Sequence, residues 1–182
     1  LSLQSISAKE DVENAAILLR AQWNLGVDPI FNLIELLESN QIKIVEVNTE
    51  DSIEGLSTWV NGSIPVIILN RGISRKKPLD RLRFTALHEL GHLILPLQNL
   101  SERKKEKLCN YFAAAMLMPK EIVLKEIGKS RLKLLIPELG NLKLQYGISI
   151  HTMAYRFKDL NMISEAYFNI FEAIDKEVST WH

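Results

Sequence analysis

The chain has few of the features that would tie it to an oxidising compartment, a membrane or a polyanion. Cys109 is its single cysteine, so no intramolecular disulfide can form, and a reducing cytoplasm is the expected setting. Lysine and arginine total 22, and so do aspartate and glutamate, which leaves no net charge and no overall nucleic-acid signature. No apolar run approaches the roughly 18 residues that a membrane-spanning helix needs.

The start of the chain also lacks two features. The first residue is Leu1 rather than methionine, which is expected of a fragment of a longer protein. The first four residues, LSLQ, are neither basic nor part of a long apolar stretch, so no signal peptide is predicted.

Because 182 residues with 47% hydrophobic content suffice for one core, we expect a single domain over residues 1–182 with a helical C-terminal part over about 130–182.

The chain does contain the sequence His88-Glu89-Leu90-Gly91-His92, which has the form H-E-x-x-H. Residues four apart lie on the same side of a helix, so the two imidazoles can converge on one ion. Neutral imidazole is a preferred zinc ligand, and catalytic zinc sites use three protein ligands and a water. Glu89 is near enough to accept a proton from that water. We therefore predict zinc bound by His88 and His92, with Glu89 as general base.

The simpler alternative is an ordinary amphipathic helix whose two histidines lie in the core or on the surface. Two features weigh against it. Half of the four histidines in the chain stand one turn apart in this motif. Gly91 lies mid-helix, where glycine costs about 0.5–1 kcal/mol relative to alanine. That cost is explained if another backbone approaches closely at this point.

Two helices and a small sheet are predicted before the motif. Ser7 and Glu10 form a capping-box pattern that opens a helix ending at Gly26. The next helix is expected to start at Asp28-Pro29.

A strand over 42–47 is followed by a hairpin with strands 56–60 and 64–69 around Asn61-Gly62. Pro65 cannot donate a backbone hydrogen bond, so this strand should begin late or lie at an edge on that side. The predicted fold class is α/β (α+β), mostly helical, with a short sheet and hairpin beside the histidine helix.

Helices are predicted for the rest of the chain. One begins at Ser101-Glu102 and becomes small and apolar over 108–118, so it should lie close against the histidine helix. Further on, an apolar stripe starts at Leu132 and Leu135, and Ser149 caps a final helix after a turn at Gly147. This pair has the outline of a helix-turn-helix, for which we expect a packing role rather than nucleic-acid contact. His151 is expected at the surface, and the basic run from Arg71 to Arg83 in solvent.

Several of these motifs together resemble the ImmA/IrrE family of metallopeptidases. The resemblance is carried by residues 85–93 (TALHELGHL) and 110–119 (NYFAAAMLMP), and also by Leu69-Asn70-Arg71, Tyr146-Gly147-Ile148-Ser149 and Tyr155-Arg156. It covers roughly residues 11–163. The resemblance implies a small zincin-like fold and bacterial or phage regulation. Such proteins commonly cleave or control helix-turn-helix (HTH) repressors, and many carry an N-terminal DNA-binding domain.

The resemblance also implies roles for residues matched by position. His88 and His92 match the two zinc ligands and Glu89 the general base. The glutamate of the family's second motif falls at Leu108, which cannot bind zinc. Glu106 is the remaining candidate third ligand, although it lies about 200° from Leu108 around a helix and reaches the same point only if the helix starts late or bends.

Two functions follow from this reading. The first is a zinc peptidase that cleaves or regulates an HTH repressor and meets DNA only through a fused or partner domain. The second is a non-catalytic regulatory domain that keeps the zincin fold with a degenerate metal site. Leu108 favours the second function, whereas the intact His88, Glu89 and His92 favour the first.

Overall fold

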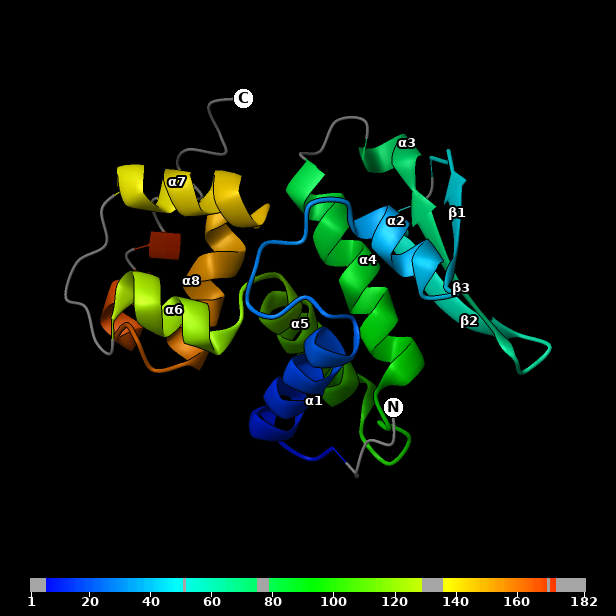
Figure 1. Cartoon of the computed structure of the whole chain (residues 1–182), viewed down its shortest axis with the longest axis horizontal. Helices are drawn as coiled ribbons and strands as arrows, with labels where there is room; N and C mark the ends of the chain where they lie inside the picture. The colour runs from blue at the N-terminus through cyan, green and yellow to red at the C-terminus, as the bar shows by residue number, and fades with distance from the viewer. Residues whose placement is uncertain (1–5, 51, 75–78, 129–135, 170, 173–182) are drawn as a thin grey trace.

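The protein is arranged around one central helix, α4 (Leu79–Ile94), as Figure 1 shows. The computed structural model describes residues 6–50, 52–74, 79–128, 136–169 and 171–172. A small sheet lies on one side of α4 and the remaining long helices on the other. The fold is the mostly helical α+β, zincin-like arrangement predicted from the sequence.

The sheet has three strands, β1 (Lys43–Val47), β2 (Gly55–Val60) and β3 (Ile64–Asn70), in the order β1-β3-β2. The predicted hairpin is confirmed, since β2 and β3 pair antiparallel, while β1 pairs parallel to β3. Pro65 pairs with Trp59 of β2, but the register with β1 begins one residue later, at Val66. The missing N–H of Pro65 therefore falls outside the β1 ladder, as expected.

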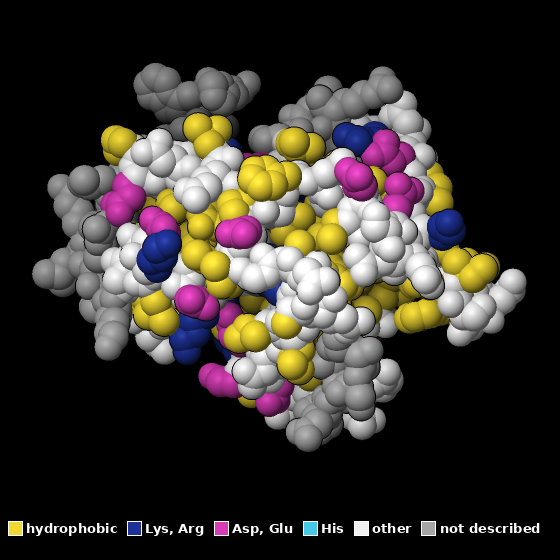
Figure 2. Space-filling model, viewed as in Figure 1, with side chains coloured by type: hydrophobic (Ala, Val, Ile, Leu, Met, Phe, Trp, Pro, Cys, Tyr) yellow, Lys and Arg dark blue, Asp and Glu magenta, His cyan; other side chains and the backbone are white. Residues whose placement is uncertain are grey.

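The inner face of the sheet packs toward α4, with Ile67 and Leu69 of β3 fully buried. Beyond this core the hairpin keeps apolar side chains in solvent. Trp59, Val60 and Ile64 are each more than 40% exposed, and hydrophobic side chains gather over the end of the hairpin in Figure 2. The hairpin tip thus extends past the part of the sheet that α4 covers.

Helix α1 (Lys9–Gln22) packs on α5 (Glu102–Leu117) through its predicted apolar face, which includes the fully buried Val12. Its start is capped differently from the prediction. The carboxylate of Asp11, rather than Glu10, accepts the backbone N–H groups of Ser7 and Ala8 at 2.9 and 3.0 Å. The reciprocal side-chain cap is therefore supplied from the first turn of the helix, one residue further along the chain than predicted.

The second helix, α2 (Leu33–Ser39), begins later than predicted, because Asn32 rather than Asp28 caps it. Two buried arginines explain the difference. The Arg20 guanidinium donates to the carbonyl of Asp28, and Arg83 donates to the carbonyl of Ile30 at 2.5 Å. These carbonyls are thus bound by side chains instead of helical N–H groups.

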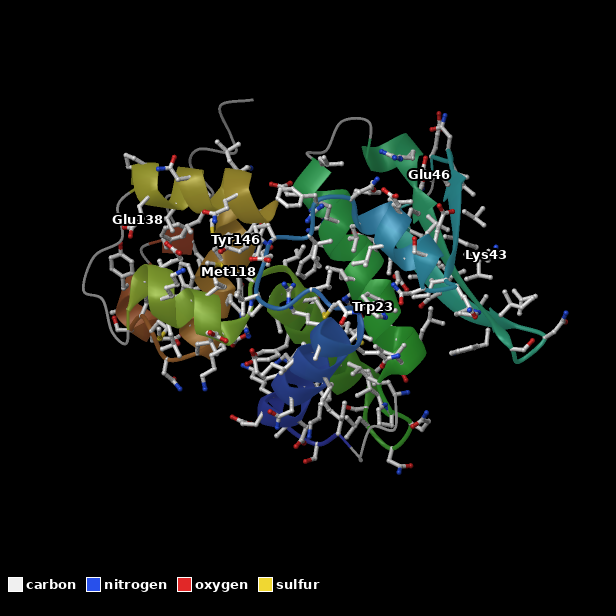
Figure 3. All side chains as sticks on the ribbon, in the orientation of Figure 1. Trp23, Lys43, Glu46, Met118, Glu138 and Tyr146 are labelled. Carbon is white, nitrogen blue, oxygen red and sulfur yellow. The ribbon has the colours of Figure 1, made fainter. Side chains whose placement is uncertain are left out.

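The C-terminal part consists of α6 (Lys120–Ile127), α7 (Ile136–Tyr146) and α8 (Ile150–Asp159). The predicted cap of α8 is confirmed, since the Ser149 hydroxyl accepts the Thr152 N–H at 3.0 Å. Met118 and Tyr146, labelled in Figure 3, are buried and lie toward the centre of the molecule. The predicted stripe residues Leu132 and Leu135 lie outside the described residues.

A buried polar cluster joins α8 to α1 and α5, and we call Arg156, Glu13 and Tyr111 the arginine cluster. Arg156 is fully buried, and its Nη2 donates to Glu13 Oε1 at 2.7 Å. Its Nη1 lies 2.7 Å from Glu13 Oε2 without the alignment of a hydrogen bond, so that contact is ionic. The Tyr111 hydroxyl also donates to Glu13, at 2.9 Å. This cluster fixes the C-terminal helices to the body of the protein.

The arginines of the predicted basic run from Arg71 to Arg83 have two kinds of partner. Arg71 and Arg81 are in exposed ion pairs with Glu46 and Glu54. Arg83 is only 8% exposed and donates to backbone carbonyls, including that of Gly147 at 3.2 Å. Residues 75–77 of the run lie outside the part of the chain that the structure describes. In that part, no helix has both the length and the apolar character needed to cross a bilayer.

Candidate metal centre

Helix α4 brings the two histidines of the H-E-x-x-H motif together. The Nε2 atoms of His88 and His92 are 3.1 Å apart, and the two rings meet edge to face with centroids at 4.8 Å. Their four-residue spacing produces this convergence on an uninterrupted helix. The opposite side of α4 is core, where Leu87 and Leu90 are fully buried.

Glu106 of α5 completes the group. Its two carboxylate oxygens lie 3.2 Å from Nε2 of His88 and 3.1 Å from Nε2 of His92. One ligand atom from each of the three residues lies within 4.8 Å of the others. The structure therefore brings together the three residues that the sequence analysis named as ligand candidates, from two consecutive long helices.

Leu108 does not face the histidines. It is 4% exposed and belongs to the hydrophobic core, so the position to which the resemblance assigns the family's glutamate holds an apolar core residue in this chain. Helix α5 begins at Glu102, as expected, and Glu106 nevertheless lies beside the histidines. Glu106 and Asn110 are four residues apart and share the side of α5 that meets the histidines. The 200° estimate was measured from a residue on the core side.

The close approach of α4 and α5 depends on Gly91. A methyl group at this position would lie 3.3 Å from the Cα, Cβ and Sγ atoms of Cys109. This confirms the predicted reason for a mid-helix glycine. Burial, followed by the charges of Glu106 and Glu89, raises the pKa of the Cys109 thiol to about 12. Cys109 is thus a packing residue rather than a nucleophile.

Asn110 orients His88, a contact that the sequence analysis missed. The Nδ1 atom of His88 lies 2.8 Å from Oδ1 of Asn110. An amide oxygen only accepts hydrogen bonds, so Nδ1 carries the proton and Nε2 presents its lone pair toward Glu106 and His92. Burial lowers the pKa of His88, and His92 lowers it further, against the opposing charges of Glu106 and Glu89. The neutral ring needed for metal binding is therefore favoured.

Glu89 is held beside this group by strand β2. It is 9% exposed, and the Ser57 hydroxyl donates to its Oε2 atom at 2.7 Å. Gly55 permits the contact, because a methyl group there would lie 2.7 Å from Thr85 Cγ2 and 3.0 Å from Glu89 Cγ. Ser57 was also missed from the sequence, since nothing local links a strand residue to a carboxylate 32 positions later.

These side chains fit a zinc ion. Two imidazole nitrogens and one carboxylate form a His₂Glu donor set, which leaves a fourth position for water or substrate. Asn110 supplies the outer hydrogen bond that metal-binding histidines commonly make. His151, by contrast, lies on α8 and is exposed, as predicted, outside the group of described residues that could hold a metal.

The helix with paired histidines, the adjoining sheet and the carboxylate from the next helix have the layout of a zincin-like domain. The family model of the IrrE N-terminal-like domain (peptidase M78) matches residues 37–158, which contain all of these elements. The chain belongs to this family.

A solved structure of a Mycobacterium tuberculosis transcriptional regulator has a similar fold, with a TM-score of 0.56 and 16% sequence identity over 81% of this chain. The match spans 46% of that regulator's length. Among curated proteins, no sequence matches the chain significantly.

Proposed function

We propose that the chain is a zinc-dependent peptidase domain that cleaves or regulates an HTH-type transcriptional repressor in the cytoplasm. The observation that carries the proposal is the convergence of His88, His92 and Glu106 within 4.8 Å, directly beside the carboxylate of Glu89. Membership in a peptidase family supports the reaction class. The repressor as partner rests on the family resemblance, and DNA would be met only through a fused or partner domain.

In this proposal His88, His92 and Glu106 hold the ion, and Asn110 keeps His88 in the binding tautomer. Zinc at such a site polarises the scissile carbonyl and lowers the pKa of a coordinated water. Glu89 accepts the proton of the attacking water and later delivers it to the leaving amine. Ser57 fixes the Glu89 carboxylate through its 2.7 Å hydrogen bond, so little reorganisation is needed during the reaction.

Strand β2 offers a place for a peptide substrate. In the described sheet β2 is an edge strand whose one neighbour is β3, so its second backbone edge is unpaired in the sheet. An extended peptide can add to such an edge through main-chain hydrogen bonds. Because Ser57 of β2 contacts Glu89, a peptide on this edge would pass beside the proposed general base.

The alternative is a regulatory domain with a degenerate metal site. Its main support was Leu108 at the expected ligand position. The carboxylate of Glu106 lies within 3.2 Å of both histidines, which favours the peptidase over this alternative. The alternative therefore serves as the outcome that the following experiment would establish if cleavage is absent.

The test begins with zinc content, measured by mass spectrometry on protein purified without added metal. We expect roughly one zinc per chain, as for a site with three protein ligands. The protein is then incubated with an HTH repressor encoded nearby. Zinc-dependent cut products are expected.

Glu89→Gln separates the two functions. A general base acts only in the chemical step, so this variant should keep its zinc and its partner binding while cleavage falls by at least about 100-fold. Glu121→Gln, an exposed change on α6, is the matched control and should cut normally. Repressor regulation that is identical in both variants, without any cut product, would establish the non-catalytic alternative.

A further inference from the structure

A pocket of about 560 Å³ lies between α1, α4, α5 and α8 and adjoins the metal centre. Two of its lining residues contact His88: Asn110 through the 2.8 Å hydrogen bond, and Phe84 through a ring contact with centroids 6.5 Å apart. A ligand that reaches the histidines can therefore extend into this pocket. Its volume is in the range of sites that bind small ligands or side chains.

The exposed rim of the pocket is mainly basic. Four cationic side chains, one from each of four helices, line it, and they are Lys9, Arg81, Lys107 and Lys158. Asp159 is the one acidic residue in its lining. Arg156 also contributes to the lining but is fully buried and paired with Glu13, so it belongs to the scaffold.

The rim cations can exchange their present partners for an anionic ligand. Lys9, Arg81 and Lys158 form ion pairs with Asp159, Glu54 and Glu165 that are partly or largely exposed. Such surface pairs contribute only about 0–1 kcal/mol, so an incoming anion can replace them. Lys107 is exposed and forms no ion pair with any described residue. It comes three residues before Asn110 on α5, so it lies one turn from the contact with His88.

We propose that this pocket is the anionic subsite of the metal-centre cleft, and that it takes an acidic side chain of the peptide bound across His88 and His92. The inference rests on the proposed peptidase function, because it places the peptide at the metal. The cations are spread over four helices around an open volume, which suits the flexible carboxylates of a peptide. A phosphate would share the same charge chemistry, and the experiment separates the two sources.

The test measures peptide binding without cleavage, using zinc-loaded Glu89→Gln protein. Two dye-labelled pools of random dodecapeptides are compared by fluorescence anisotropy at low salt, one enriched in glutamate and the other in glutamine at the same positions. We expect the glutamate pool to bind about fivefold more tightly, the ratio for one partly exposed ion pair. The preference should decline as salt is raised.

Lys107→Gln should abolish this preference while leaving binding of the glutamine pool unchanged. Lys104→Gln is the matched control, because Lys104 is exposed on the same helix but does not line the pocket. Equal binding of the two pools, equal losses in the two variants, or no peptide binding at all would each overturn the inference. Sodium phosphate that binds through Lys107 while both pools bind equally would assign the pocket to a small anion and likewise overturn the peptide subsite.

Cleavage by the unmodified protein distinguishes this inference from the proposed function. If glutamate peptides bind through Lys107 and no peptide is cut, the peptidase function fails and the subsite stands as a binding site. If both pools are cut at equal rates, the peptidase function stands and the subsite is wrong. If the glutamate pool is cut faster and Lys107→Gln removes the advantage, both are supported.

Discussion

The metal centre and the arginine cluster both hold charged or ionisable side chains between helices, but they are completed in different ways. In the arginine cluster, the Arg156 cation faces the Glu13 carboxylate, and Tyr111 adds a donor. In the metal centre, ring nitrogens and a carboxylate converge at about 3.1–3.2 Å. The first group balances its own charge. The second collects ligand atoms with no fixed cation, which is what an ion-binding site requires.

The side chains of the two sites also differ in their exposure to solvent. Arg156 is fully buried and the Glu13 side chain is 8% exposed, whereas the Glu106 side chain is 53% exposed. A buried pair couples to the stability of the fold, because breaking it leaves a charge without water. An exposed carboxylate is dispensable for folding and accessible to a metal. The comparison therefore predicts that changes in the arginine cluster alter stability, while changes in the metal centre alter metal binding.

Arg156→Met should have the largest effect. It leaves the Glu13 carboxylate buried without its cation, and the free energy of unfolding should fall by about 3–5 kcal/mol. Urea unfolding measures the loss, and zinc per folded chain should stay unchanged. Adding Glu13→Leu should recover part of the stability. A loss below about 1 kcal/mol would show that the buried pair does not hold the C-terminal helices in place.

Leu108→Glu tests the position to which the family resemblance assigns the glutamate of the second motif. The side chain is 4% exposed in the core, so an unpaired carboxylate there should lower stability by about 2–4 kcal/mol. Zinc affinity, measured by titration with a competing chelator, should not rise. Leu108→Met, which conserves volume, should cost less than about 1.5 kcal/mol. Tighter zinc binding by a folded Leu108→Glu protein would show that a carboxylate at position 108 can reach the zinc ion.

Glu106→Gln is expected to act through the metal alone. Without zinc, its unfolding free energy should stay within about 0.5 kcal/mol of the parent, because the side chain is exposed. With zinc at 100 times the dissociation constant, the parent should gain about 2.7 kcal/mol, and the variant should lose most of that gain. Thermal melts with and without zinc measure both quantities. Equal gains in the two proteins would exclude Glu106 as a ligand.

The smallest expected effect is a loss of stability at acidic pH. Burial raises the pKa of Glu13, but the hydrogen bonds and charge of Arg156 outweigh it, so the pKa lies below the ordinary value of 4.5. The unfolded chain therefore binds this proton more readily. The stabilisation is fully present above about pH 4.5 and is lost as the pH falls through the lowered pKa. Glu13→Gln should flatten this part of the stability curve, measured by urea unfolding, and a curve parallel to the parent's would contradict the assignment.

Local patterns predicted much of the fold. The alternation in β1, the Asn61-Gly62 hairpin, the Ser149 cap and the spacing of His88 and His92 are short-range features, and each is present in the structure. The start of α2 was wrong because Arg20 and Arg83, distant in sequence, bind the carbonyls before it. Propensity cannot report a competitor that arrives from another helix.

The orientation of Glu106 was misjudged for a related reason. The direction in which Glu106 projects from α5 was estimated relative to Leu108. Which side of α5 belongs to the core depends, however, on how this helix packs against α4. The spacing of Glu106 and Asn110 was a usable signal, because residues four apart share a helix side. The contacts of Ser57 with Glu89 and of Arg156 with Glu13 had no such signal, since they join residues 32 and 143 positions apart.

The contact between Gly91 and Cys109 acts as a spacer for the metal centre. The ligands come from two helices, so the distance between α4 and α5 decides how far Glu106 stands from the histidines, and a hydrogen atom at position 91 sets that distance. Even an alanine, with a methyl only 3.3 Å from Cys109, would push α5 outward by a few tenths of an ångström. An alanine at position 91 is therefore expected to weaken zinc binding by moving Glu106 away from the histidines. Substitutions at position 91 therefore offer a way to tune zinc affinity without changing any ligand residue.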